Sequence, residues 1–164
     1  MIATTAKVHP DAFVAETAYV LDNAEIGAGV EVLDRAVVCE NAQLRGRVRV
    51  KDDAIIAGNA YVYGNHVGEP DYNPRYLVVS GNARIMGFAE VRGATVVTDD
   101  ALVEGNARII GRPRIGRGMY VGGDAQIAGT RSWIAAAGET RRMVDGKHDM
   151  GELNIRKSRR KSWA

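Results

Sequence analysis

Cysteine, large aromatic residues and long apolar runs are all scarce in this chain of 164 residues, which has one Cys, two Phe and two Trp. A single Cys excludes an internal disulfide and fits a reducing compartment. No apolar run reaches the roughly 18 residues that a membrane-spanning helix needs. Residues 1–6 are too short for a signal peptide and lack its positively charged start. We therefore expect one domain with a core of small aliphatic side chains and without a membrane span.

Aliphatic residues recur every six positions along most of the chain, with a small residue, usually Ala, two places earlier. The aliphatic positions are Val8, Val14, Val20, Ile26, Val32, Val38, Leu44, Val50, Ile56 and Val62, and then Val79, Ile85, Val91, Val97, Val103, Ile109, Ile115, Val121 and Ile127. A helix repeats near 3.6 residues and a strand near 2, so neither explains a period of six. A chain that turns a corner every six residues does, and such hexads predict an all-β, parallel β-helix.

The spacing of asparagines indicates three sides per coil. Asn23, Asn41 and Asn59 lie 18 residues apart, which is three hexads, and nineteen hexads then give about six coils. Asn tolerates the left-handed backbone conformation that tight corners need, and stacked Asn amides can form ladders.

The period divides the chain into a body and a C-terminal segment. Residues 1–129 form the predicted β-helix, interrupted at 63–78 by a segment rich in Gly, Asn and Pro that predicts a protruding corner loop. Residues 130–164 lack the period and are predicted to form a cap and an arm. Ser132 is the candidate N-cap of a short helix over the last coil, ending near Ala137.

One outer face of the predicted helix is apolar. The residues that flank the aliphatic positions point outward, and six on one side are uncharged: Tyr19, Leu21, Val37, Cys39, Ile55 and Ala57. If the loop is a simple corner insertion, this face continues through Met86, Leu102 and Tyr120. A contiguous apolar patch usually marks an interface, so we expect a homo-oligomer, and a three-sided body favours a trimer.

The other two faces carry mixed charge. Glu31 precedes Arg49 by 18 residues, and Glu90 precedes Arg108 by the same interval. These residues should therefore stack as cross-strand pairs of opposite sign that help to fix the register of the sheet.

The C-terminal segment is basic. Residues 130–164 carry a net charge of +5, whereas residues 1–129 carry −3. The basic run is Arg156, Lys157, Arg159, Arg160 and Lys161, followed by Trp163. It is either a solvated tail or an arm that docks on an acidic partner. Aromatic residues do not interleave with the run, which disfavours a nucleic-acid partner.

The strict hexads and the opening run from His9 to Val20 resemble the left-handed parallel β-helix (hexapeptide-repeat) superfamily, and that run also resembles γ-class carbonic anhydrase-like proteins. The superfamily includes acyltransferases and these anhydrases, both usually trimeric. Repeats of the form Gly58-Asn59-Ala60 resemble those of phage and prophage β-helix proteins. The left hand is implied by this resemblance alone, since the general rule for parallel crossovers gives a right hand.

Histidines are too few and too scattered for the anhydrase site that the resemblance suggests. His9, His66 and His148 lie in different parts of the chain and form no pair at metal-ligand spacing. An acyltransferase needs one general base, which leaves His66 in the loop as a candidate. The chain lacks the further hexads with small residues that often line a coenzyme A groove.

We therefore interpret the chain as a non-enzymatic structural protein without metal or cofactor. Its expected partners are further copies of itself and the acidic protein surface of a larger assembly, with no nucleic acid or membrane. The phage-like repeats favour a decoration (cement) protein on the outer surface of a tailed-phage capsid, in contact with the shell protein; outside a phage, the expected location is the cytoplasm. The alternative is a hexapeptide acyltransferase with His66 as its base.

Overall fold

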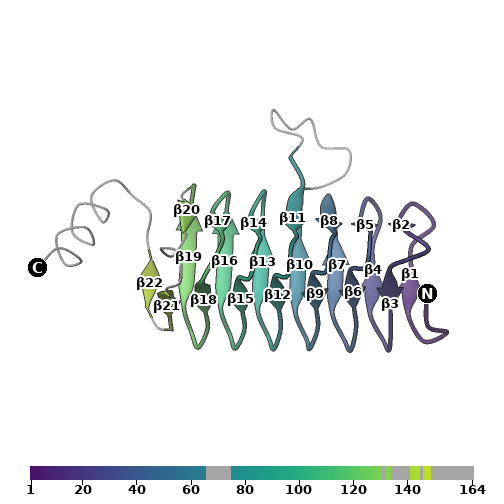
Figure 1. Cartoon of the computed structure of the whole chain (residues 1–164), viewed down its shortest axis with the longest axis horizontal. Coiled ribbons are helices and arrows are strands. Elements are labelled where there is room, and N and C mark those ends of the chain that lie inside the picture. The colour runs from purple at the N-terminus through teal and green to yellow at the C-terminus, as the bar shows by residue number, and fades with distance from the viewer. Residues whose placement is uncertain (66–74, 131, 134–140, 145, 149–164) are drawn as a thin grey trace, which may run out of the picture.

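The chain winds into a three-sided parallel β-helix (Figure 1). The computed structural model describes residues 1–65, 75–130, 132–133, 141–144 and 146–148. Successive strands lie in three sheets in turn, and every paired strand is parallel to its neighbour. The coils stack in chain order, so the first and last strands lie at opposite ends of the body.

The strands are short, and each belongs to one of three sheets that we name sheets I, II and III. Sheet I contains β1 (Lys7–Val8), β4 (Glu25–Ile26), β7 (Gln43–Arg45), β10 (Tyr61–Tyr63), β13 (Glu90–Arg92), β16 (Arg108–Gly111), β19 (Gln126–Gly129) and β22 (Lys147–His148). Sheet II contains β2 (Phe13–Val14), β5 (Glu31–Val32), β8 (Val48–Val50), β11 (Leu77–Val79), β14 (Val96–Val97), β17 (Arg114–Ile115) and β20 (Ser132–Trp133). Sheet III contains β3 (Tyr19–Val20), β6 (Val37–Val38), β9 (Ile55–Ile56), β12 (Arg84–Ile85), β15 (Leu102–Val103), β18 (Met119–Val121) and β21 (Arg141–Met143).

The aliphatic hexad positions fill the interior of the helix, as predicted. All of them are buried except Val8 and Val14, which lie in the first coil and are covered by a neighbouring coil on one side only. The residues two places earlier, such as Ala36 and Ala54, are also buried, apart from Ala6 and Ala12 in the first coil. Burial of a Val or Ile side chain contributes about 1.5–3 kcal/mol, so the stacked aliphatic columns supply most of the stabilisation.

The break in the sequence period is a corner insertion between sheets I and II. Paired residues are 18 apart in the regular coils, as in Val20 with Val38, but 29 apart across the break, as in Tyr61 with Glu90. The sheets continue through the break without a change of face. Residues 66–74, which include most of the predicted loop, lie outside the described part of the chain.

The helix has about seven turns, one more than the sequence period predicts, because three strands follow Ile127. Ser132, Arg141 and Lys147 pair with residues 18, 22 and 21 positions earlier. Backbone hydrogen bonds can extend each sheet while the corners vary in length, so the six-residue period is lost although the coil continues. The helix predicted from Ser132 is wrong at its start, where β20 lies, and residues 134–137 are outside the described ranges.

The corner asparagines form ladders but do not adopt the left-handed conformation that we expected of them. Asn41 Nδ2 lies 3.3 Å from Asn59 Oδ1, and Asn23 Nδ2 lies 3.5 Å from Asn41 Oδ1. The positive φ angles belong to the residues just before the asparagines, 55° at Asp22 and 59° at Glu40. A backbone reversal needs one such residue, and the following side chain is then free to pair between coils.

The three-sided architecture agrees with the left-handed β-helix that the resemblance implies. No helix long and apolar enough to cross a membrane is found among the residues that the structure describes.

Candidate functional site

The predicted apolar face lies on sheet III. Tyr19, Val37 and Ile55 are directly paired across β3, β6 and β9, and the second column follows each strand: Leu21, Cys39 and Ala57. Tyr19 is 41% exposed, Ala57 is buried, and the other four are half-buried. The structure therefore places all six predicted residues along sheet III, five of them with exposed surface, and their role in oligomerisation stays a prediction.

Cys39 behaves as a small apolar residue within this face. Partial burial, with smaller contributions from the carboxylates of Glu40 and Asp22, raises the pKa of its thiol above the usual value. The thiol therefore stays protonated at neutral pH, as suits an apolar surface rather than a nucleophile.

The apolar face becomes mixed in its later coils. Met86, Leu102 and Tyr120 lie on sheet III as predicted, but Arg84 is paired between Ile55 and Leu102. Charged side chains also surround the tyrosine, since its hydroxyl donates to a Glu104 carboxylate oxygen at 2.6 Å and the Arg142 guanidinium lies 4.5 Å from its ring centroid. The purely apolar area is thus confined to β3, β6 and β9.

Phe88 is an exposed aromatic residue that the sequence reasoning missed. It is 67% exposed and lies at the corner between sheets III and I. Its neighbours along this corner are Asn59 in the coil before and Asn106 in the coil after. The backbone N–H of Asn59 donates to the Gly87 carbonyl, and the backbone N–H of Phe88 donates to the Gly105 carbonyl. Phe88 therefore occupies a position of this corner where the neighbouring coils carry Asn.

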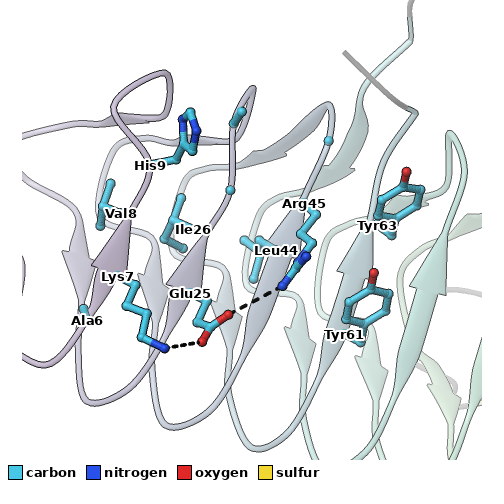
Figure 2. A pocket seen from close by; sticks show the side chains of 13 residues that line it. Ala6, Lys7, Val8, His9, Glu25, Ile26, Leu44, Arg45, Tyr61 and Tyr63 are labelled. Carbon is cyan, nitrogen blue, oxygen red and sulfur yellow. Dashed lines mark hydrogen bonds and ion pairs between the residues drawn. The ribbon is translucent and has the colours of Figure 1, made fainter. Parts of the chain in front are cut away.

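Sheet I carries a groove that sequence reasoning did not predict (Figure 2). Its volume is about 960 Å³, and it crosses β1, β4, β7 and β10. At a strand spacing of about 4.8 Å, these four strands give it a length of about 14 Å. The outward side chains that line it are Lys7, His9, Glu25, Arg45, Tyr61 and Tyr63. Gly27 also lines the groove and has no side chain to fill it.

A chain of charged residues occupies the first half of the groove. Lys7 Nζ lies 2.9 Å from Glu25 Oε1, and Arg45 Nη2 lies 3.6 Å from Glu25 Oε2 (Figure 2). The hydrogen bond from Lys7 and the charge of Lys7 hold the pKa of Glu25 below its usual value; burial opposes them, and the charge of Arg45 makes the smallest contribution. The carboxylate is therefore ionised at neutral pH and shared between two cations, which leaves one excess positive charge.

Two tyrosines stand at the other end of the groove. The rings of Tyr61 and Tyr63 are parallel to within 5°, with centroids 6.2 Å apart. Arg92, on the next strand, lies with its guanidinium 5.7 Å from the Tyr61 centroid and does not line the groove. The sequence signal was present, because both tyrosines are outward positions of one strand, 18 residues after Gln43 and Arg45.

A third cluster, on sheet II, fixes the end of the loop. Arg49 Nε donates to Glu31 Oε2 at 2.6 Å, which confirms the first predicted stacking pair. Tyr76 donates its hydroxyl to the other oxygen at 3.0 Å, and the Arg49 guanidinium lies 4.3 Å from its ring centroid. The second predicted pair is also present, with Arg108 Nε 3.1 Å from Glu90 Oε2.

The histidines and the basic C-terminal residues singled out in the sequence lie in different places, and several of them fall outside the described ranges. His66, the candidate base, falls in 66–74, and the predicted arm residues Arg156, Lys157, Arg159, Arg160, Lys161 and Trp163 also fall outside. His9 lines the groove, whereas His148 belongs to β22 in the last coil. Within the described ranges, no group of three or more His, Cys, Asp or Glu side chains is placed to hold a metal ion.

No protein-family model and no curated protein matches the chain. Among solved structures it is similar to the UDP-N-acetylglucosamine acyltransferase of Campylobacter jejuni, with 17% sequence identity and a TM-score of 0.36. The match covers 77% of this chain and 66% of that protein. The three parallel sheets and the hexads themselves assign the chain to the parallel β-helix fold.

Proposed function

We propose that the protein is a non-enzymatic structural subunit whose β-helix forms a homotrimer and attaches to a larger assembly. The observation that carries the proposal is the apolar face of β3, β6 and β9, where three directly paired side chains, Tyr19, Val37 and Ile55, contain no charge. By contrast, the first three strands of sheet I and the first three of sheet II carry charged residues at outward positions: Lys7, Glu25, Glu31, Arg45 and Arg49. Apolar side chains gathered on one side favour a subunit contact there.

In its more specific form, the proposal makes the protein a decoration protein on the outside of a tailed-phage capsid. Its support is the style of the repeats and the basic sequence at the C-terminus, which suits an acidic protein surface. The rigid stack of coils suits a role in which a body is held at a fixed place on an assembly.

Sedimentation equilibrium of the purified protein at micromolar concentration tests the subunit contact. We expect the mass of a trimer, and we expect Val37→Glu to give monomers or aggregates, because a charge would be buried without a partner. Val96→Glu is the matched control, since Val96 is also a half-buried outward valine but lies on sheet II, opposite Arg114. A wild type that sediments as a monomer contradicts the proposal.

The acyltransferase alternative predicts a different result. Calorimetric binding of coenzyme A that is lost in His66→Ala would replace the structural proposal with the enzymatic one. On the structural proposal, neither the wild type nor the variant binds coenzyme A.

A further inference from the structure

The groove on sheet I has an aromatic end, formed by two half-buried tyrosines. Tyr61 and Tyr63 both line the groove, and the cation that covers Tyr61 approaches from the neighbouring strand β13 outside it. The face of an aromatic ring carries partial negative charge and attracts the weakly positive C–H groups of a flat, partly apolar ring. Two parallel rings on one strand therefore offer a stacking surface for a ring-shaped ligand (Figure 2).

The opposite part of the groove offers hydrogen-bond donors for an anionic group. Arg45 is 54% exposed in its side chain, and its distance of 3.6 Å from Glu25 is longer than a direct hydrogen bond. Its guanidinium can therefore turn to a ligand carboxylate, which it binds through two parallel donors. Lys7 adds a second cation, 77% exposed in its side chain.

Further donors and acceptors complete the lining. His9 Nδ1 accepts the backbone N–H of Asp11 at 3.0 Å, so the neutral imidazole carries its proton on Nε2 and can donate from there. Glu25 and the two tyrosine hydroxyls can accept hydrogen bonds. A ligand with hydroxyl groups, which both donate and accept, matches this mixture.

We propose that the groove binds an acidic saccharide, with a sugar ring against Tyr61 and Tyr63 and a carboxylate held by Arg45 and Lys7. An acidic sugar supplies the ring, the hydroxyls and a carboxylate together. The length of about 14 Å, over four strands, suits a short oligomer rather than one sugar. A single-stranded nucleic acid also stacks on aromatic residues, and its binding is one of the outcomes that the titration below distinguishes.

The groove and the apolar face belong to different sheets, so the two proposals are independent. Loss of the trimer in Val37→Glu tests only sheet III, and substitutions in the groove test only sheet I. A monomeric wild type would leave the saccharide proposal standing.

Isothermal titration of the full-length protein tests the site with three probes. These are short oligomers of galacturonic or glucuronic acid, the matching neutral oligosaccharides, and a single-stranded DNA octamer. We expect at least one uronate oligomer to bind, with its neutral counterpart at least tenfold weaker and the DNA weaker still. Absence of uronate binding at millimolar concentration, equal affinity for the neutral sugar, or tighter binding of DNA would overturn the proposal.

Substitutions place the site within the groove. Arg45→Gln should weaken uronate binding at least tenfold and leave the neutral sugar unchanged, whereas Tyr63→Ala should weaken both. Arg114→Gln, an exposed arginine of sheet II, is the control and should bind as the wild type does. Circular dichroism confirms that each variant is folded, and full uronate affinity in both folded groove variants would show that the sugar binds elsewhere.

Discussion

At the residue scale, the corners are shaped by single residues with a left-handed backbone. Asp52 has a φ of 61°. Its backbone N–H donates to the carboxylate of Asp34 in the coil before it, and its own carboxylate accepts the N–H of Gly81 in the next coil. Asp tolerates this conformation because its short side chain can bond to nearby backbone. Such aspartates thus combine the turn with a bond between coils.

Gly64 shows how closely the coils approach at the base of the loop. It is buried at the end of β10, and a Cβ added there would lie 2.1 Å from the carbonyl oxygen of Arg47. The obstacle is backbone, which cannot move without breaking the bond that Leu77 N donates to the same carbonyl.

We therefore expect Gly64→Ala to lower the free energy of unfolding by about 1–3 kcal/mol, the usual cost of overpacking. Urea denaturation followed by circular dichroism measures this change. The control is Gly27→Ala, where the nearest atom is 3.1 Å from the added Cβ, so the loss should be much smaller. Equal stability of Gly64→Ala and the wild type would show that the backbone around Gly64 can move aside without cost.

At the scale of elements, strands β5 and β8 hold the end of the loop through Tyr76. The hydrogen bond from Arg49 is the main reason why the pKa of Glu31 lies below its usual value. Partial burial raises this pKa, whereas the hydrogen bond from Tyr76 and the charge of Arg49 lower it further. Burial and the bond to Glu31 raise the pKa of Tyr76, so its hydroxyl keeps the proton that it donates.

A lowered carboxylate pKa gives a defined dependence of stability on pH. The contribution of Glu31 is fully present above the unfolded-state pKa of about 4.3 and is lost as pH falls through the lower folded-state value. We expect Glu31→Gln to cost about 1 kcal/mol or less at pH 7, because the pair is partly exposed to solvent. The cost should shrink below pH 4.

Urea denaturation of wild type and Glu31→Gln between pH 3 and pH 8 measures this dependence. Glu16→Gln, at an exposed corner of the first coil, serves as the control for replacing any carboxylate. A difference in unfolding free energy between wild type and Glu31→Gln that stays constant across the pH range would mean that the Glu31 charge does not stabilise its contacts with Arg49 and Tyr76.

At the scale of the whole molecule, the body and the basic C-terminus should be separable. The last described strand, β22, ends at His148, before the basic run begins. Deletion of 155–164 should therefore leave the melting temperature of the β-helix within about 2 °C, since no described core residue is removed.

The same deletion should weaken attachment to the assembly if the arm docks on carboxylates, and attachment of the intact protein should weaken as salt rises. Binding of truncated and full-length protein to undecorated particles, counted across a salt series, measures both effects. Equal occupancy at every salt concentration would assign the contact to the β-helix body.

The sequence by itself determined the fold and the apolar face, because a six-residue period admits one arrangement of inward and outward positions. Val38 must be inside if Val37 and Cys39 are outside, and the 18-residue spacing then places Tyr19 beside Val37. The stacking of Arg49 on Glu31 followed from the same spacing.

Only the tertiary structure decided the number of turns, the corner geometry and the groove. The last strands pair through backbone hydrogen bonds, which do not depend on side-chain type. The six-residue sequence period therefore ends before the last coil does. The groove is lined by side chains from four coils, with Gly27 between His9 and Arg45 of the neighbouring coils. Such a groove is a property of several side chains in three dimensions, and no single position in the sequence encodes it.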